Sequence, residues 1–357
     1  MTIIIAEAGV NHNGSESLAL KLVDAAFHAG ADIVKFQTFK AKNLVTKHAN
    51  QAEYQAINMG KRESQLHMLS KLELSFQTHL NLVSHCNDVG IEFLSTAFDF
   101  ESLRFLVKEL GLKRLKIPSG DITNAPLVLE HARSGCDIIL STGMSTLSEI
   151  EAALGVIAFG YISGKNSPPS ISAFEDAYTS DEGQAALRNK VSILHCTTEY
   201  PAPVQEINLR AIGTLNSAFK LVTGYSDHSS GIAIPIAAVA RGALIIEKHF
   251  TLDRSMEGPD HKASLEPDEL NMMVSAIRQV EQALGDGIKR PTQSESSNKI
   301  VARKSLCAAC DINKGEKLTP ENISILRPGG GESPYYYWHF IGSLASRSYL
   351  EGELLDE

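Results

Sequence analysis

The chain has 357 residues, of which 43% are hydrophobic and 21% charged, the ordinary usage of a globular protein with a sizeable core. The formal net charge of −9 argues against nucleic acid as a partner, because binding to phosphates requires a basic surface. The longest apolar stretch, around residues 231–240, is too short to span a membrane, and the first residues enter a strand-like segment directly, so we expect a cytoplasmic protein without a membrane partner.

Eight short apolar runs, rich in β-branched residues and bounded by Gly, Pro or Ser, follow one another in the first part of the chain. They are IIIAEAG (3–9), DIVKFQT (32–38), IEFLSTA (91–97), RLKIPSGD (114–121), DIILSTG (137–143), VSILHCT (191–197), LVTGYSDH (221–228) and LIIEKHF (244–250). Most are followed by a stretch with helical periodicity, so the pattern predicts eight βα units and a (β/α)8 TIM barrel. Each run ends on charged or hydrogen-bonding residues. In such a barrel the carboxyl ends of all strands meet on one face, where active sites lie.

Capping residues and periodicity predict the helices between these runs. Helices are expected over residues 15–30 and 265–285, each ending at a glycine. Residues 40–75 contain polar and helical-looking pieces and are long enough to fold over the strand ends as a lid. Residues 160–190, with two prolines and many serines, are expected to form a surface excursion.

Composition divides the chain into two domains. We predict a barrel domain over residues 1–285 and a polar, helix-breaking linker over residues 286–299. Short strand-like runs after the linker predict a small β-rich domain over residues 300–357. A domain of this size is marginal alone, so we expect it to pack on the barrel or on a partner subunit.

A pair of histidines ends the seventh and eighth runs and is a candidate metal site. His228 and His249 come from strands that are neighbours in a closed barrel. Two imidazoles with oxygen ligands nearby suit a divalent ion that keeps positions for water and substrate. No cysteine is expected near enough to complete a structural zinc site, which leaves manganese, magnesium or cobalt as candidate ions. His195 lies deeper in its run, and we expect it to be a packed residue.

Two lysines, Lys35 and Lys116, lie among apolar residues in the second and fourth runs. Lysines are almost never buried without an anionic partner. The partner could be an internal carboxylate, Glu7 or Asp121, or it could be an anionic ligand. Short hydroxyl donors on neighbouring runs favour a phosphate or carboxylate ligand; they are Thr96, Ser119, Ser141 and Ser226. A Schiff-base aldolase, in which one lysine is the nucleophile, is the main rival hypothesis.

Four carboxylates are available for proton transfer or for contacts with sugar hydroxyls. They are Glu7, Asp121, Glu247 and Asp260. A carboxylate in a confined site can have a raised pKa and act as a general acid or base. We predict catalytic roles for Glu7, Glu247 and Asp121, but the pattern does not rank them.

These residues lie in a series of ordered motifs that covers nearly the whole chain. The motifs are IIAEAGVNHNG, VKFQTF, LKIPSGD, ILSTGM, HCTTEYPAP, GYSDHSSG and EKHFT followed by GPDH. In this order and spacing they resemble the N-acetylneuraminate (sialic acid) synthase family, and the later ILRPGGG is similar to that family's antifreeze-like (SAF) domain. Members condense phosphoenolpyruvate with an N-acetylated mannose-type sugar and water, releasing phosphate and a nine-carbon 2-keto acid.

The resemblance implies a role for each matching residue. Phosphoenolpyruvate would be held by Lys35, Thr96, Lys116, Ser119, Ser141 and Ser226. His228 and His249 would ligate Mn2+ or Mg2+. The sugar or the reacting centre would be contacted by Glu7, Gln37, Tyr200, Glu247 and Asp260.

The resemblance also implies an assembly. Arg327, in the antifreeze-like domain, is similar to a residue that family members place on the sugar's N-acetyl group across a domain-swapped homodimer.

The chain departs from the family at two positions. Asp121 stands where the sialic acid enzymes often carry Glu, and Thr198, which we assign to the sugar site, stands where some carry Asn. Both departures leave the exact sugar open.

Several functions therefore remain in competition. The default is an N-acetylneuraminate synthase that uses N-acetylmannosamine. Within the same chemistry the alternatives are legionaminate and pseudaminate synthases, which use 2,4-diacetamido-trideoxyhexoses, and residues 40–75 with Asp121 should decide among them. The more distant alternatives are the Schiff-base aldolase and a non-enzymatic carbohydrate-binding protein built on the C-terminal domain.

Overall fold

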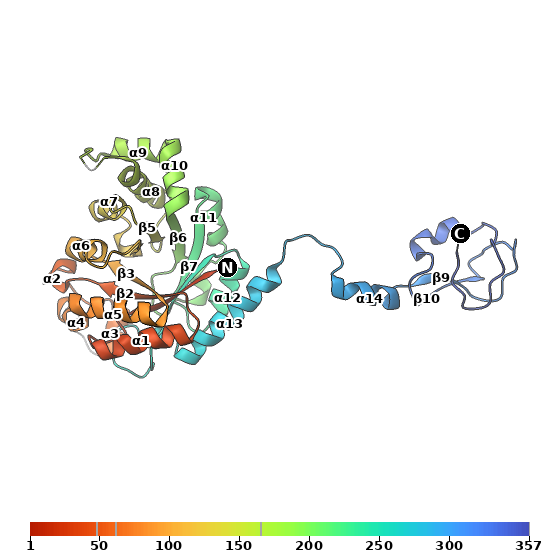
Figure 1. Cartoon of the computed structure of the whole chain (residues 1–357), viewed down its shortest axis with the longest axis horizontal. Coiled ribbons are helices and arrows are strands. Elements are labelled where there is room, and N and C mark those ends of the chain that lie inside the picture. Colours follow the sequence, from red (N-terminus) through yellow and green to blue (C-terminus); the bar gives the residue numbers. More distant parts are fainter. Residues whose placement is uncertain (48, 61–62, 165, 357) are drawn as a thin grey trace. The chain divides into compact units, whose positions relative to one another are not determined.

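The computed structural model describes residues 1–47, 49–60, 63–164 and 166–356. The chain forms two compact units, Met1–Gly285 and Asp286–Glu357 (Figure 1). Among the described residues, none of the helices has the length and apolar character needed to cross a bilayer.

The first unit is built on a closed barrel of parallel strands. Within the described residues, the strands pair in chain order, and β8 pairs with β1 to close the ring. They are β1 (Ile3–Gly9), β2 (Ile33–Thr38), β3 (Glu92–Ala97), β4 (Arg114–Ile117), β5 (Asp137–Ser141), β6 (Val191–Cys196), β7 (Val222–Asp227) and β8 (Ile245–His249). The predicted barrel is confirmed. A layer of Ile, Leu and similar side chains, among them Ile5, Leu94 and Ile139, fills its interior.

Helices cover the outside of the barrel (Figure 1). They are α1 (Glu16–His28), α5 (Phe76–Val89), α6 (Phe100–Lys108), α7 (Ala125–Arg133), α8 (Leu147–Ile162), α11 (Ala211–Phe219), α12 (Ala233–Ala240) and α13 (Pro267–Leu284). Helix α1 begins where the Ser15 side chain accepts a hydrogen bond from the Leu18 backbone, and α13 begins with Pro267 in its first turn. Short 3-10 turns are η1 (Ser119–Asp121), η2 (Val204–Glu206) and η3 (His261–Ala263).

Two insertions interrupt the alternation of strands and helices. The first follows β2 and carries α2 (Ala41–Leu44), α3 (Glu53–Met59) and α4 (Gln65–Leu72). The second follows α8 and carries α9 (Ile171–Thr179) and α10 (Asp181–Lys190). Phe174 of α9 packs against the cluster beneath α8, where Gly155 lets the two helices approach closely. The expected surface excursion is therefore a packed helical pair.

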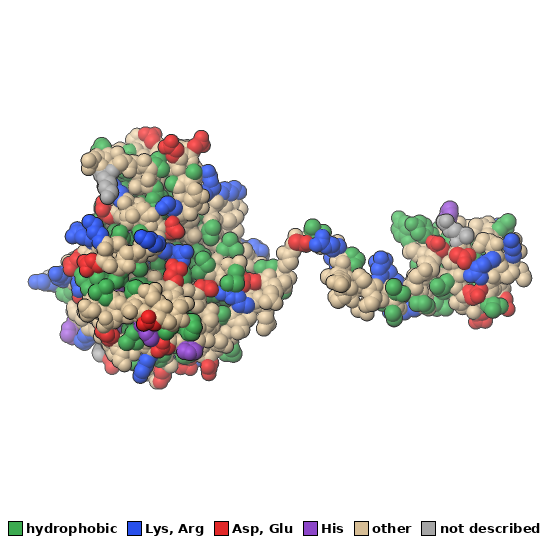
Figure 2. All heavy atoms as spheres, viewed as in Figure 1, with side chains coloured by type: hydrophobic (Ala, Val, Ile, Leu, Met, Phe, Trp, Pro, Cys, Tyr) green, Lys and Arg blue, Asp and Glu red, His purple; other side chains and the backbone are tan. Residues whose placement is uncertain are grey.

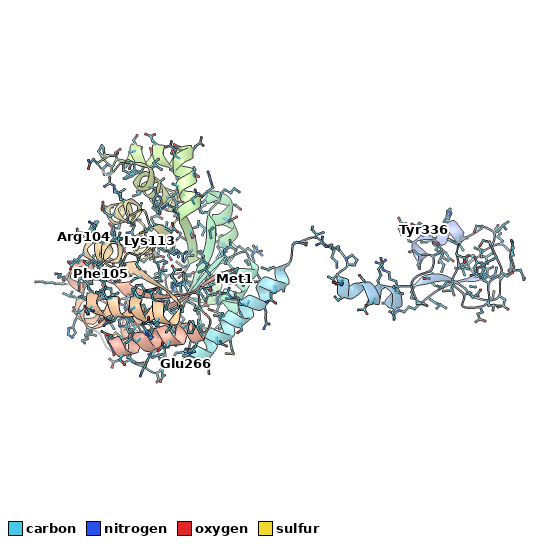
Figure 3. The ribbon with its side chains drawn as sticks, in the orientation of Figure 1. Met1, Arg104, Phe105, Lys113, Glu266 and Tyr336 are labelled. Atoms are coloured by element: carbon cyan, nitrogen blue, oxygen red, sulfur yellow. The ribbon has the colours of Figure 1, made fainter. Side chains whose placement is uncertain are left out.

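The second unit contains α14 (Gln293–Ala302), β9 (Ser305–Ala308), β10 (Ile323–Leu326), η4 (Pro334–Tyr336) and α15 (Tyr337–Phe340). Strands β9 and β10 pair antiparallel over a small core that includes Leu306 and Phe340. Helix α14 lies partly in the segment expected to break helices, because Thr292 and Glu295 form a capping box there. Tyr336 projects from this unit (Figure 3), and acidic and basic side chains are interspersed on the visible face of each unit (Figure 2).

Candidate active site

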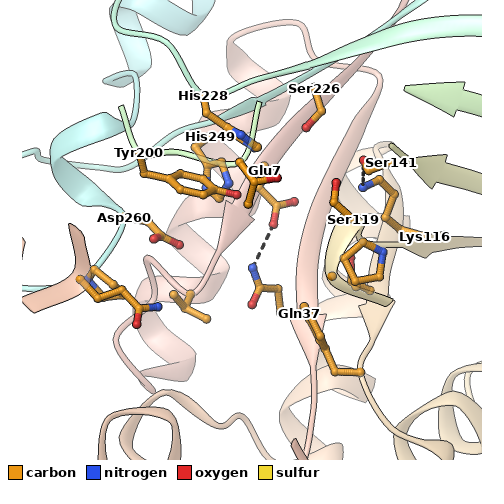
Figure 4. Close-up of a pocket in the computed structure, with 18 of the residues that line it drawn as sticks. Glu7, Gln37, Lys116, Ser119, Ser141, Tyr200, Ser226, His228, His249 and Asp260 are labelled. Carbon is orange, nitrogen blue, oxygen red and sulfur yellow. Dashed lines mark hydrogen bonds between the residues drawn. The ribbon is translucent and has the colours of Figure 1, made fainter. Parts of the chain in front are cut away.

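A pocket of about 310 Å³ lies at the carboxyl ends of the barrel strands. Figure 4 shows its polar side, with Glu7 between the pair His228 and His249 and the group Ser119, Ser141 and Lys116. The lining contains fourteen of the residues predicted from the sequence: Glu7, Lys35, Gln37, Thr96, Lys116, Ser119, Ser141, Thr198, Tyr200, Ser226, His228, Glu247, His249 and Asp260. Cys196 of the sixth run also lines the pocket, so the strand ends bring residues from all eight runs to one site.

Two buried lysines and two buried glutamates form an ion-pair network at the floor of the pocket. Lys35 Nζ lies 2.5 Å from Glu7 Oε2 and 3.6 Å from Glu247 Oε2. Lys116 Nζ lies 3.4 Å from Glu247 Oε1. Each lysine thus has an internal carboxylate partner, as one of the two interpretations of the sequence expected, but the partner of Lys116 is Glu247 rather than Asp121.

Hydroxyl groups complete the network around these charges. Lys116 Nζ donates a hydrogen bond to Ser141 Oγ at 2.6 Å, and Lys35 Nζ donates to Thr96 Oγ1 at 3.3 Å. Ser226 Oγ donates to Glu247 Oε1 at 2.7 Å. Short donors and ammonium groups therefore face one small volume, which is the arrangement that binds phosphate or carboxylate oxygens.

Burial and the ion pairs shift the pKa values of the two glutamates in opposite directions. Burial raises the pKa of Glu7 to about 7, although Lys35 opposes the shift. Burial also acts to raise the pKa of Glu247, but Lys116 and Lys35 outweigh it, so that this pKa falls below its ordinary value. Burial lowers the pKa of Lys116. Paired carboxylates with separated pKa values are typical of acid and base catalysis.

The histidine pair has neutral rings with nitrogen atoms available for a metal ion. The ring centroids of His228 and His249 lie 5.6 Å apart. His228 Nδ1 lies 2.6 Å from the Thr197 carbonyl oxygen, which can only accept, so Nδ1 carries the proton and Nε2 is the unprotonated nitrogen. Burial lowers the pKa of both rings, that of His228 to about 4. His249 Nδ1 is buried and has no hydrogen-bond partner among the described residues.

This donor set fits a divalent ion at an open site. Two neutral imidazoles supply borderline ligands. No group of three or more His, Cys, Asp or Glu side chains that could hold a metal ion is found in the described part of the chain. An ion held by His228 and His249 would leave coordination positions for water and substrate.

Tyr200 and Asp260 lie beside the histidines. The Tyr200 ring centroid is 4.2 Å from that of His228. Burial raises the pKa of Asp260 to about 6. The loop that carries Asp260 is held in place because Ser264 Oγ donates to the Asp260 carbonyl oxygen at 2.7 Å and receives a hydrogen bond from Asn11 Nδ2 at 2.9 Å.

A buried ion pair behind the histidines was not predicted as part of the site. Lys248 Nζ lies 2.6 Å from Asp227 Oδ2, and both side chains are fully buried. Asp227 also accepts hydrogen bonds from the Ser229 backbone and the Tyr225 hydroxyl. Asp227 and Lys248 directly precede His228 and His249 in the chain, so the pair fixes both strand ends that carry the candidate ligands. The sequence did contain a signal for this pair, because Asp227 and Lys248 are charged residues inside two apolar runs.

The inserted segment forms the other side of the pocket, and we call residues 40–75 the lid. Its lining residues are Leu44, Val45, Gln55, Gln65, Met68, Leu69 and Leu72. The sequence predicted a lid in this segment, but it did not predict that any of these side chains would line the pocket. The spacing of Met68, Leu69 and Leu72 indicated a buried helical face without showing what that face contacts.

Hydrogen bonds fasten the lid at its base and at its tip. At the base, Glu73 accepts a hydrogen bond from the Ala41 backbone at 3.0 Å and pairs with Lys40 Nζ at 2.8 Å. At the tip, Asn58 Nδ2 donates to the Pro259 carbonyl oxygen at 2.7 Å. Pro259 lies beside Asp260 in the pocket lining, so the lid is attached to the loop after β8.

Asp121 and His195 are not part of the pocket lining, and Arg327 belongs to the second unit. Asp121 is in η1, where its carboxylate accepts a hydrogen bond from Asn124 Nδ2 at 3.1 Å. Arg327 is exposed in the second unit, so its role in the sugar site stays a prediction. His195 Nε2 donates to the Ile207 carbonyl oxygen at 2.6 Å and its ring packs near Tyr225, as expected for a packed residue.

Comparisons with known proteins identify the family of the chain. The NeuB family model matches residues 22–289, and the SAF domain model matches residues 303–357. The chain is 50% identical over 356 residues to the N,N'-diacetyllegionaminic acid synthase of Campylobacter jejuni. The match covers 100% of this chain and 99% of the relative. It is 43% identical to the N,N'-diacetyllegionaminic acid synthase of Legionella pneumophila, over 99% of this chain and 92% of the relative.

A solved structure is also similar. It is the crystal structure of the N-acetylneuraminic acid (sialic acid) synthetase of Leptospira borgpetersenii in complex with citrate, with 35% identity and a TM-score of 0.65. The match covers 83% of this chain and 90% of that one. The resemblance seen in the ordered motifs is confirmed. The chain belongs to the NeuB family and carries a SAF domain over residues 303–357.

Proposed function

We propose that the protein condenses phosphoenolpyruvate with a 2,4-diacetamido-2,4,6-trideoxyhexose and water, giving N,N'-diacetyllegionaminic acid and phosphate. The observation that carries this proposal is the 50% identity, over essentially the whole of both chains, to a relative named as an N,N'-diacetyllegionaminic acid synthase. The similarity to a sialic acid synthetase is lower, at 35%. The comparisons therefore favour the alternative sugar over N-acetylmannosamine, which the sequence motifs had suggested as the default.

The floor of the pocket suits phosphoenolpyruvate. Its phosphate and carboxylate groups need cationic and hydroxyl donors, and Lys35, Lys116 and Ser141 already converge there. The lysines are paired with carboxylates, and a bound anion would compete for the same ammonium groups. On this proposal the lysines bind charge and form no covalent bond.

The histidines and carboxylates suit the condensation itself. A divalent ion held by His228 and His249 would supply Lewis-acid polarisation of the sugar aldehyde. Water adds to C2 of the former phosphoenolpyruvate and must lose a proton to a nearby base. Glu7 is the better placed acceptor, because Glu247 is engaged by Lys116, by Lys35 and by the Ser226 hydroxyl. Glu7 has the Lys35 ion pair and a long hydrogen bond of 3.4 Å from Gln37.

A phosphate-release assay tests the function directly. The purified chain is supplied with phosphoenolpyruvate, Mn2+ and one sugar at a time: 2,4-diacetamido-2,4,6-trideoxyhexoses of different configuration, and N-acetylmannosamine. We expect kcat/KM to be highest with a diacetamido sugar. A preference for N-acetylmannosamine would overturn the sugar assignment. A borohydride-stable adduct with pyruvate on Lys35 or Lys116 would support the aldolase instead.

A further inference from the structure

The two sides of the pocket differ in polarity. The strand ends contribute charged and hydroxyl side chains, whereas most of the lid's contribution is aliphatic. Leu44, Val45, Met68, Leu69 and Leu72 all line the cavity. We call these five residues the lid wall. An apolar surface of this kind inside a sugar-binding pocket is informative, because a sugar hydroxyl that faces it loses hydrogen bonds to water without replacement.

The lid wall is preformed rather than loose. Met68 and Leu72 are buried in a cluster with Val10, Phe39 and Ala41, and Leu44 and Leu69 pack against the same cluster. Helix α4 also lies close to the loop after β1, where a side chain at Gly14 would meet the Lys71 carbonyl oxygen at 2.3 Å. The wall therefore presents a fixed apolar surface to whatever occupies the pocket.

The position of the reacting groups determines which end of the sugar meets this surface. The anion-binding floor and the histidine pair lie on the strand ends, so the sugar aldehyde must point toward them. The far carbons of an open-chain hexose then extend toward the lid. At those carbons a 2,4-diacetamido-2,4,6-trideoxyhexose carries a methyl group at C6 and an acetamido methyl at C4, where N-acetylmannosamine carries hydroxyls.

We propose that the lid wall determines sugar specificity by accepting the C6 methyl and the C4 acetamido methyl, a role that rests on the proposed function. Leu69 and Leu44 are the residues that we assign to this discrimination, because both line the pocket and keep some exposure while Met68 is buried. Gln65, in the same lining, can supply amide hydrogen bonds to the acetamido group. A hydroxyl facing the wall would lose its hydrogen bonds to water without replacement. A single apolar group of this kind discriminates by roughly 10- to 200-fold.

The test compares kcat/KM for the diacetamido sugar with kcat/KM for N-acetylmannosamine in wild type and in Leu69→Asn. Asparagine has nearly the shape of leucine but offers hydrogen bonds. We expect the ratio of the two values to fall by at least about tenfold, mainly through loss with the diacetamido sugar. Leu44→Asn, on a different helix of the lid, should shift the ratio in the same direction.

Leu66→Asn is the matched control. Leu66 lies on α4 and packs against the same apolar cluster but is not part of the pocket lining. It should lower stability without changing the ratio. An unchanged ratio in both Leu69→Asn and Leu44→Asn, or an equal change in Leu66→Asn, would overturn the role of the lid wall. If wild type releases no phosphate with any of the sugars, the proposed function itself fails, and this outcome is distinct from turnover with an unaltered preference.

Discussion

The two sides of the pocket are held in place by different forces. On the strand side the candidate catalytic and binding residues are neighbours in the β-ladder: Glu7 is paired with both Lys35 and His249, and Glu247 with Ser226. On the lid side the positions of Met68 and Leu69 depend on side-chain packing and on a few hydrogen bonds. Backbone pairing tolerates side-chain changes, so the strand side can keep its geometry while the lid side varies. We therefore expect strand-side substitutions to affect the reaction, and lid substitutions to affect the choice of sugar.

The largest effect should come from breaking the ion pair that anchors the strand side. Lys248→Met leaves Asp227 buried and unpaired, and we expect the free energy of unfolding to fall by about 3–5 kcal/mol. Denaturant titration measures the change. The double variant Asp227→Leu/Lys248→Met removes both charges and should recover part of the loss. Equal destabilisation of the single and double variants would show that charge pairing is not what anchors these strands.

The next effect concerns the histidine pair. His249→Ala should reduce kcat at least about 100-fold, because on the proposed function it removes one of the two imidazoles that would hold the activating ion. Excess chelator should abolish wild-type turnover, with Mn2+, Mg2+ or Co2+ restoring it, and calorimetry should show weaker Mn2+ binding to the variant. His195→Gln, which keeps a donor to the Ile207 carbonyl, is the control and should retain metal-dependent activity. Full activity in excess chelator would exclude the metal assignment.

Lys116→Met should act on phosphoenolpyruvate binding. A charge-assisted contact to a ligand anion is worth roughly 1.5–3 kcal/mol, so we expect the KM for phosphoenolpyruvate to rise roughly 10- to 150-fold with the fold intact. Lys113→Met removes an exposed lysine three residues away and should leave this KM unchanged. Matching increases in both variants would mean that overall charge, and not the buried contact, governs binding.

The smallest expected effect is on the pH dependence of stability. Burial lowers the pKa of His12, in the loop after β1, to about 3, whereas the ordinary value is 6.5. Between these values the unfolded chain binds a proton that the folded chain does not, so stability present at neutral pH is lost as the pH falls. His12→Asn should make this loss shallower by up to about 1.4 kcal/mol per pH unit. Denaturant titrations between pH 6 and pH 4 measure both slopes, and identical slopes would contradict the assignment.

The strand side could be predicted from the sequence, and the lid side only in outline. Residues such as Lys116 and His249 end apolar runs, and barrel topology brings all such ends together whatever their spacing in the chain. Asp121 shows the limit of this rule: β4 ends at Ile117, and the η1 turn places the carboxylate outside the pocket lining. Contacts such as that between Asn58 and Pro259 join residues far apart in sequence, and no local pattern encodes them.

The clasp formed by Glu73 with Lys40 and Ala41 has a consequence for protein engineering. Because it brings the two ends of the lid together beside β2, the intervening segment leaves and re-enters the barrel at almost one place. Such a segment can be exchanged without changing the register of the strands or the packing inside the barrel, provided that its contacts with Val10, Phe39 and Pro259 are kept. On the proposed role of the lid wall, we expect libraries of lid sequences on this scaffold to yield enzymes with altered sugar preference.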